Sequence, residues 1–190
     1  MFTAASSCAT LAPDEDLEPL LVRASAAALR AAELEPAQID RVYGAAVLGR
    51  HVEPSPLYFV HHALGLRRDA LVAPQATSFS AFMTSLLLAA EAVRSGAARH
   101  VLVVVGSRMS PHVEPGSGYA LAIADGATAV VVGPGTRNVI VDHATDTQGA
   151  LYDATTLSAR RPAPGRGAIT FDIAAEHLRG VHDYGIQGPA

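Results

Sequence analysis

The stretch Ala76–Ser107, which reads ATSFSAFMTSLLLAAEAVRSGAARHVLVVVGS, carries most of the information about the fold. It opens with a short turn of small and hydroxyl residues around Ser78-Phe79-Ser80. The run that follows, from about Phe79 to Arg94, is apolar on nearly all sides of a helix and predicts a helix buried in the centre of the molecule. The continuous apolar run Val101–Val105 predicts a strand that is covered on both faces.

Helices and strands alternate on either side of this stretch. Apolar residues recur at helical spacing from Leu17 to Leu34, after an acidic helix start at Pro13–Asp16. This alternation implies right-handed crossovers and a mainly parallel sheet. The other expected elements are a candidate strand within Met1–Ala12, a strand within Ile39–Val47, a helix Leu57–Leu64 closed by Gly65, a strand Ala70–Ala73, a strand within Ile123–Val132, a strand Asn138–His143, a loop Ser158–Gly167 and a helix Ile173–His182.

The bulk composition limits the class of protein. The chain has 190 residues, 49% of them hydrophobic and 17% charged, which suits one globular domain with a sizeable core. A net charge of −4 without a basic stripe argues against nucleic-acid binding. Cys8 is the only cysteine, so a disulfide within the chain is excluded. Neither a secretory signal nor an apolar run of about 18 residues is present, and we expect a cytoplasmic protein.

Four short phrases, in order along the chain, are typical of one enzyme family. They are Ile39-Asp40, Leu64-Gly65-Leu66, Ser95-Gly96 and Asp125-Gly126-Ala127. With the turn, helix and strand of Ala76–Ser107, they resemble the amino-terminal half of the ketoacyl-acyl-carrier-protein synthase III-like enzymes of the thiolase fold. The resemblance implies an α/β thiolase-like half-fold over residues 1–190. Its sheet would be mixed, mainly parallel and five-stranded, with helices on both faces.

The same resemblance implies that the family's nucleophile is missing. The family turn reads approximately Ala-Cys-x-Gly-Phe, and counting from Phe82 and from Ser95-Gly96 places Phe79 on the cysteine position. A family member also carries a second half that supplies a histidine and an asparagine, and no His-x-x-Asn follows in this sequence. Ser78 is either a replacement hydroxyl nucleophile, which would need a neighbouring base, or simply the cap of the helix that follows.

Around the turn we expect a substrate pocket lined by Phe79, Ser80, Met109 and His112. Phe79 would either plug the site or pack as an ordinary core aromatic. We expect no metal site, because neither His61-His62 nor the pair His177 and His182 has the spacing of two ligands on one helical face. No cofactor motif occurs, so none is expected.

Two functions remain open at this point. The first is a catalytically degenerate half that serves as a partner or structural subunit in polyketide or fatty-acid biosynthesis. Its open apolar faces would be covered by a homo-oligomer or by a thiolase-fold partner chain. The alternative is an acyltransferase or condensing enzyme that uses Ser78 with residues from a second chain. Acyl-carrier protein or acyl-CoA would then be the partner, with the loop arginines Arg160, Arg161 and Arg166 available for phosphate or acidic groups.

Overall fold

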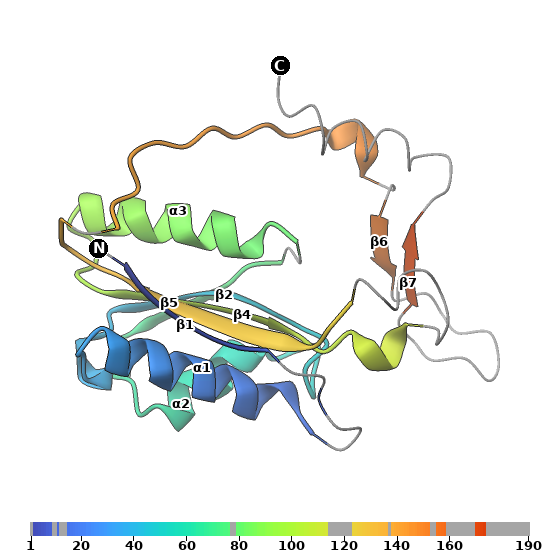
Figure 1. The fold of residues 1–190 in the computed structure, drawn as a ribbon, viewed down its shortest axis with the longest axis horizontal. Coiled ribbons are helices and arrows are strands. Elements are labelled where there is room, and N and C mark those ends of the chain that lie inside the picture. The colour runs from blue at the N-terminus through green and yellow to red at the C-terminus, as the bar shows by residue number, and fades with distance from the viewer. Residues whose placement is uncertain are drawn as a thin grey trace.

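The computed structural model describes residues 2–8, 11, 15–76, 79–113, 123–136, 138–152, 155–158 and 170–173. Its main body is one mixed sheet with helices on both sides (Figure 1). The elements in chain order are β1 (Phe2–Cys8), α1 (Leu17–Ala31), the 3-10 turn η1 (Pro36–Gln38), β2 (Arg41–Val47), α2 (Pro56–Ala63), β3 (Leu71–Pro74), α3 (Ala81–Arg94), β4 (Val101–Ser107), η2 (Ser110–His112), β5 (Gly126–Val132), η4 (Gly149–Leu151), β6 (Thr155–Ser158) and β7 (Thr170–Ile173).

The main sheet has five strands in the order β1-β5-β4-β2-β3 among the described residues. β2 runs parallel to β3 and to β4, whereas β5 is antiparallel to both β4 and β1. Parallel and antiparallel pairings are therefore equal in number, and the expectation of a mainly parallel sheet is only partly met. The connection between β4 and β5, at residues 108–125, contains no crossover helix among its described residues. β5 therefore starts at the end of the sheet where β4 finishes and runs antiparallel to it.

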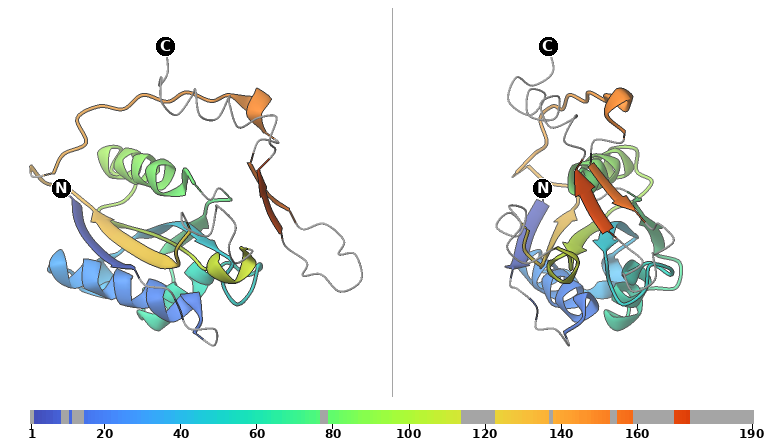
Figure 2. Two further views of the ribbon diagram at one scale, coloured as in Figure 1. Left: turned by 45° about the vertical axis from the view of Figure 1, so that its right-hand side comes forward. Right: turned by 90° about the vertical axis from the view of Figure 1, so that its right-hand side faces the viewer.

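Helices cover both faces of the sheet, as expected. α1 and α2 lie on one face and α3 lies on the other (Figures 1 and 2). The buried side chains accordingly form two clusters. The larger cluster lies between the sheet and α1 and α2, and includes Leu21, Val60 and Leu102. The smaller lies between the sheet and α3, and includes Ala89, Val101 and Val103. Since β4 contributes to both, the prediction of a strand covered on both faces is confirmed.

The prediction that α3 is buried on all sides is wrong for this chain. One face of α3 packs on the sheet through Ala81, Ser85 and Ala89. The opposite face is open: Met83 is 58% exposed and Leu88 is also exposed. The apolar pattern all round the helix was correctly recognised, but the layer that would cover the outer face is not among the described residues.

Residues 138–143 were expected to form a strand, but the structure shows no strand there. They follow β5 without regular secondary structure, and residues 141–150 are exposed. The arginine at the end of α3 contacts this segment, because Arg94 Nη2 donates a hydrogen bond of 2.8 Å to the carbonyl oxygen of Ile140. β-branched residues favour a strand only where a neighbouring strand supplies hydrogen bonds, and no described strand lies beside them.

The carboxyl-terminal part differs from expectation where it is described. β6 and β7 form a separate antiparallel pair that the sequence did not indicate, and Ile173 ends β7 instead of beginning a helix. Most of the loop Ser158–Gly167 and the rest of the helix expected to end at His182 lie outside the described residues, as do Arg160, Arg161 and Arg166.

A carboxylate before β2 aligns the amino-terminal ends of the parallel strands. Asp40 Oδ2 accepts hydrogen bonds from the backbone N–H groups of Arg99 (2.7 Å) and His100 (3.1 Å), just before β4. Asp40 Oδ1 accepts one from Arg67 Nη2 at 3.0 Å, and the Asp40 carbonyl accepts one from Leu71 N at the start of β3. Burial raises the pKa of Asp40, but these hydrogen bonds and the Arg67 charge outweigh it, so the pKa lies below its ordinary value.

We expect Asp40→Asn to destabilise the fold by about 2 kcal/mol at pH 7, because the charged acceptor of three hydrogen bonds is lost. A carboxylate with a lowered folded-state pKa stabilises the fold above its unfolded pKa of 3.8 and loses this contribution as the pH falls below that value. Urea unfolding at pH 7 and at pH 3 should therefore show a smaller gap between wild type and variant at pH 3. Asp69→Asn is the control, since Asp69 is exposed and contacts only the Arg67 side chain in the described part. An equal gap at both pH values would contradict the role of the Asp40 charge.

Gly44 marks the closest approach of β2 to β4. Its φ is +142°, and a Cβ atom at this position would lie 1.7 Å from the backbone oxygen of Val104. Both the backbone conformation and the contact therefore require glycine.

We expect Gly44→Ala to cost about 3 kcal/mol or more, because a backbone oxygen cannot move aside as a flexible side chain can. Gly149→Ala is the matched control: nothing lies within 4 Å of its added Cβ, and its effect should stay within about 0.5 kcal/mol. Thermal or urea unfolding measures both, and equal stability of the two variants would contradict the close approach.

Candidate functional site

The carboxyl ends of β2, β3 and β4 lie at one edge of the sheet, which is where ligands bind in open α/β sheets. α3 begins at this edge after β3, and η2 follows β4 there (Figure 1). The register also brings the start of β5 and the end of β1 to the same edge, since Ser107 pairs with Gly126 and Gly126 pairs with Cys8. The expected site residues before α3 and after β4 therefore share one edge of the sheet.

Two of the expected residues lie at the amino-terminal end of α3. Ser80 occupies the cap position, but its side chain makes no capping hydrogen bond. Phe79 is 76% exposed, so the interpretation of Phe79 as a core aromatic is wrong. Ser78, the candidate nucleophile, lies outside the described residues, and its roles as nucleophile or cap stay predictions.

The other two expected residues belong to the segment after β4. Met109 is buried, whereas His112 is exposed at the end of η2, with its backbone N–H bonded to the Met109 carbonyl at 2.9 Å. Neither of the two pockets found among the described residues is lined by Phe79, Ser80, Met109 or His112. A shared substrate pocket for the four residues stays a prediction.

A buried carboxylate holds η2 against the sheet. Asp125 is fully buried just before β5. It accepts hydrogen bonds from Ser110 N (2.9 Å), Ser110 Oγ (2.5 Å) and Leu11 N (3.4 Å). The sequence marked Asp125-Gly126-Ala127 as one of the four family phrases, but nothing in its pattern pointed to Ser110 as the partner of Asp125. The structure thus adds a positioning role at the candidate site that sequence reasoning missed.

A second polar cluster fixes the loop after β2 at the same edge. Glu18, buried near the start of α1, accepts a hydrogen bond from Arg50 N at 2.8 Å. The Arg50 side chain pairs with Asp16, and Arg108 Nη1 lies 3.8 Å from Asp16 Oδ1. Gly49 is needed beside them, because a Cβ there would lie 2.9 Å from Glu18 Oε1 and closer still to Pro56. These charges join α1 to the segments that follow β2 and β4.

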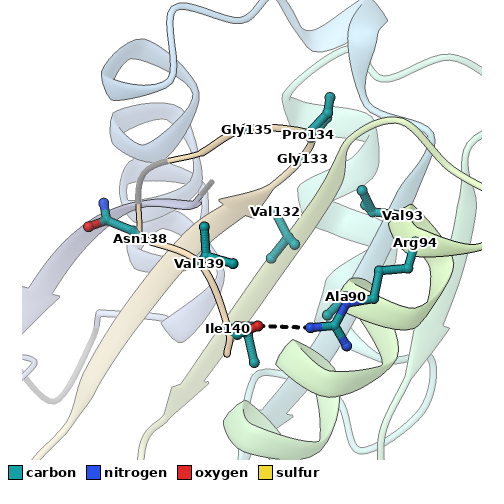
Figure 3. A pocket seen from close by; sticks show the side chains of 10 residues that line it. All are labelled: Ala90, Val93, Arg94, Val132, Gly133, Pro134, Gly135, Asn138, Val139 and Ile140. Atoms are coloured by element: carbon teal, nitrogen blue, oxygen red, sulfur yellow. Dashed lines mark hydrogen bonds between the residues drawn. The ribbon is translucent and has the colours of Figure 1, made fainter. Parts of the chain in front are cut away.

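The pocket in Figure 3 lies away from this edge, where α3 and β5 end. It is open, has a volume of about 200 Å³ and is lined mainly by apolar side chains. Arg94 closes one side through its hydrogen bond to the Ile140 carbonyl. A second pocket, beside Asp40 and Arg67, lies near the amino-terminal ends of the parallel strands. Both lie at the opposite ends of the strands from the candidate site.

Within the described ranges there is no group of three or more His, Cys, Asp or Glu side chains that could hold a metal ion. His61, on α2, instead places Nε2 2.9 Å from the Arg67 carbonyl. His177 and His182 lie outside the described residues. No helix in the described part is long and apolar enough to cross a membrane.

Known proteins match both the sequence and the fold. The family model of 3-oxoacyl-(acyl-carrier-protein) synthase III matches residues 75–149, which include α3, β4 and β5. The β-ketoacyl-(acyl-carrier-protein) synthase III of Staphylococcus aureus is 26% identical over 171 residues, which are 90% of this chain and 46% of that protein. The 3-oxoacyl-(acyl carrier protein) synthase III of Pseudomonas aeruginosa has a similar fold, with a TM-score of 0.73, 26% identity and coverage of 90% of this chain and 53% of that one. The chain is therefore similar in sequence and fold to part of the 3-oxoacyl-(acyl-carrier-protein) synthase III enzymes.

Other relatives show the same similarity. The synthase III of Streptomyces lividans is 36% identical over 124 residues, or 64% of this chain and 36% of that protein. A priming β-ketosynthase from a polyketide biosynthetic pathway matches with a TM-score of 0.73 and 26% identity, and covers 88% of this chain and 52% of that one. The fold is thus an α/β thiolase-like half. The chain spans between about a third and about half of the length of these relatives.

We expect Asp125→Asn to destabilise the fold by about 2 kcal/mol, because a buried charged acceptor of backbone and hydroxyl donors is removed. Ser110→Ala should cost less, because it leaves the backbone donor of residue 110 in place. Amide exchange at residues 108–113 should accelerate more in the first variant than in the second. Unchanged exchange in Asp125→Asn would contradict the positioning role of this carboxylate.

Proposed function

We propose that the chain is a catalytically degenerate synthase III half that serves as a partner or structural subunit in polyketide or fatty-acid biosynthesis. The observation that carries the proposal is the open apolar face of α3, on which Met83 and Leu88 are exposed. Solvent-facing helix surfaces are normally polar, so an apolar one indicates a contact surface.

Loss of chemistry is the second part of the proposal. The family turn aligns its nucleophilic cysteine with Phe79, an aromatic side chain that cannot form a thioester. Two of the polar side chains described at this edge, Asp125 and Ser110, bond to each other, and Asp125 also accepts hydrogen bonds from backbone N–H groups. Their contacts support a structural use of the edge.

The alternative function is acyl transfer through Ser78, with a base supplied by a second chain. The position of this serine just before α3 favours it, because the amino-terminal end of a helix stabilises developing negative charge. The acyl donor would be acyl-CoA or an acyl-carrier protein. In the transfer, the Ser78 oxygen would form an ester with the acyl group, and the thiol of the donor would leave with the serine proton.

Incubation with acetyl-CoA and with acetylated acyl-carrier protein, followed by intact-mass measurement, separates the two functions. We expect no mass increase, because the family's cysteine position holds a phenylalanine. Ser80→Ala serves as the matched control for Ser78→Ala. A covalent acetyl adduct that persists in Ser80→Ala and disappears in Ser78→Ala would overturn the degenerate assignment and establish the alternative.

A further inference from the structure

A polar pocket lies at the amino-terminal ends of the parallel strands, at the opposite end of the sheet from the candidate site. Its volume is about 410 Å³, within the range of about 300–1,000 Å³ that is typical of small-molecule pockets. Five charged residues line it: Asp40, Arg41, Arg67, Asp69 and Arg99. Since three of them are arginines and two are aspartates, the wall has an excess of positive charge. Such a wall favours an anionic ligand.

The charge of Arg67 is already used within the fold. Its Nη2 donates to Asp40 Oδ1 and its Nε donates to Asp69 Oδ1, each at 3.0 Å. Its Nη1 donates to the Ala37 carbonyl at 3.2 Å. Arg67 and the two carboxylates therefore form a structural group that compensates its own charge. A ligand in this pocket has to be bound by the other two arginines.

Arg41, at the start of β2, is held in place without being neutralised. Its Nη1 donates to the Tyr43 hydroxyl at 2.8 Å, and its Nη2 donates to the Ala97 carbonyl at 3.0 Å. Both acceptors are uncharged. A guanidinium has five N–H donors, so three of them remain for a ligand. Because the side chain is already fixed, its binding to a ligand costs less conformational entropy than that of a free side chain.

Arg99 supplies a second positive charge, from the segment just before β4. In the described part of the chain, neither Arg99 nor Arg41 forms an ion pair with a carboxylate. The backbone N–H of Arg99 is bonded to Asp40, which fixes the main chain, and the residue is exposed. The two arginines come from neighbouring strand starts, since Arg41 pairs with Val101 in the sheet. Two guanidinium groups without a carboxylate partner therefore belong to one pocket.

We infer that this pocket binds the phosphate group of a small, polar phosphate ester. At pH 7 such a group carries a charge of about −1.5 to −2 and three acceptor oxygens, which matches two guanidinium groups better than a single carboxylate does. Guanidinium groups bind phosphate oxygens through pairs of N–H donors. The volume of the pocket exceeds that of one phosphate group, so it has room for the rest of the ester. The inference goes beyond the proposed partner role and does not depend on it.

An NMR titration of the full chain, followed through its backbone amide shifts, tests the site. The probe is ribose 5-phosphate, and inorganic phosphate, ribose and citrate are the comparisons. We expect saturable shifts at residues 96–101 with a dissociation constant on the order of 1 mM, because solvent and salt screen the charges of an open pocket. Inorganic phosphate and citrate should each bind at least threefold more weakly, and ribose should give no saturable shift.

Variants of the two arginines assign the binding to this pocket. Arg99→Ala should raise the dissociation constant of ribose 5-phosphate at least fivefold. Arg41→Lys keeps the charge but loses the planar set of donors, and it should raise the constant at least twofold. Arg68→Ala is the matched control and should leave the constant unchanged, because Arg68 is exposed beside Arg67 but does not line the pocket.

Four results would contradict the inference. The first is the absence of a saturable shift at ten times the expected dissociation constant. The second is inorganic phosphate binding as tightly as the ester, which would leave only a site for the free ion. The third is citrate binding as tightly, which would assign the pocket to carboxylates. The fourth is an equal loss of affinity in Arg68→Ala and Arg99→Ala, which would indicate unspecific attraction to a charged surface.

Discussion

The hydrogen bonds around Asp40 set the register on which the rest of the sheet depends. One carboxylate contacts the segment before β4 and the arginine before β3, and its own backbone pairs with both neighbouring segments. β2 and β4 start in register at Arg41 and Val101 and end in register at Val47 and Ser107, whereas the shorter β3 ends earlier, at Pro74. The carboxyl-terminal edge, with the start of α3 and the turn after β4, is therefore positioned by a contact at the far end of the strands.

Much of this architecture could be predicted from the sequence because it depends on local patterns. The spacing of apolar residues between Leu17 and Leu34 located α1 to within a few residues, and the run Val101–Val105 located a strand buried on both faces. The phrase Ile39-Asp40 pointed to the family before its physical role was known. Its carboxylate proves to join segments about 60 residues apart, and such a contact leaves no periodic signal in a sequence.

The expectations that failed concerned segments whose structure or burial depends on the neighbouring parts of the fold. The apolar pattern of α3 predicted a helix covered on all sides, whereas its outer face is exposed, because a sequence pattern does not show what packs against a helix. Residues 138–143 have strand-forming side chains, yet a strand also requires a neighbour. For the same reason, the candidate site could be predicted only in part from the sequence. Met109 and His112 were expected near the turn because of their order along the chain. The hydrogen bond between Ser110 and Asp125 arises from tertiary contact alone.

The unequal size of the two cores has a consequence for the order in which the molecule folds. Among the described residues, the cluster between the sheet and the helices α1 and α2 contains more buried side chains, including Leu17, Leu21 and Leu102, whereas the α3 side is built largely from alanine and valine. Burial of larger side chains releases more free energy, so the α1 side is the more stable layer and the α3 side opens first. The layer that carries the candidate site is thus the last to become rigid, and its order depends most on whatever packs above it.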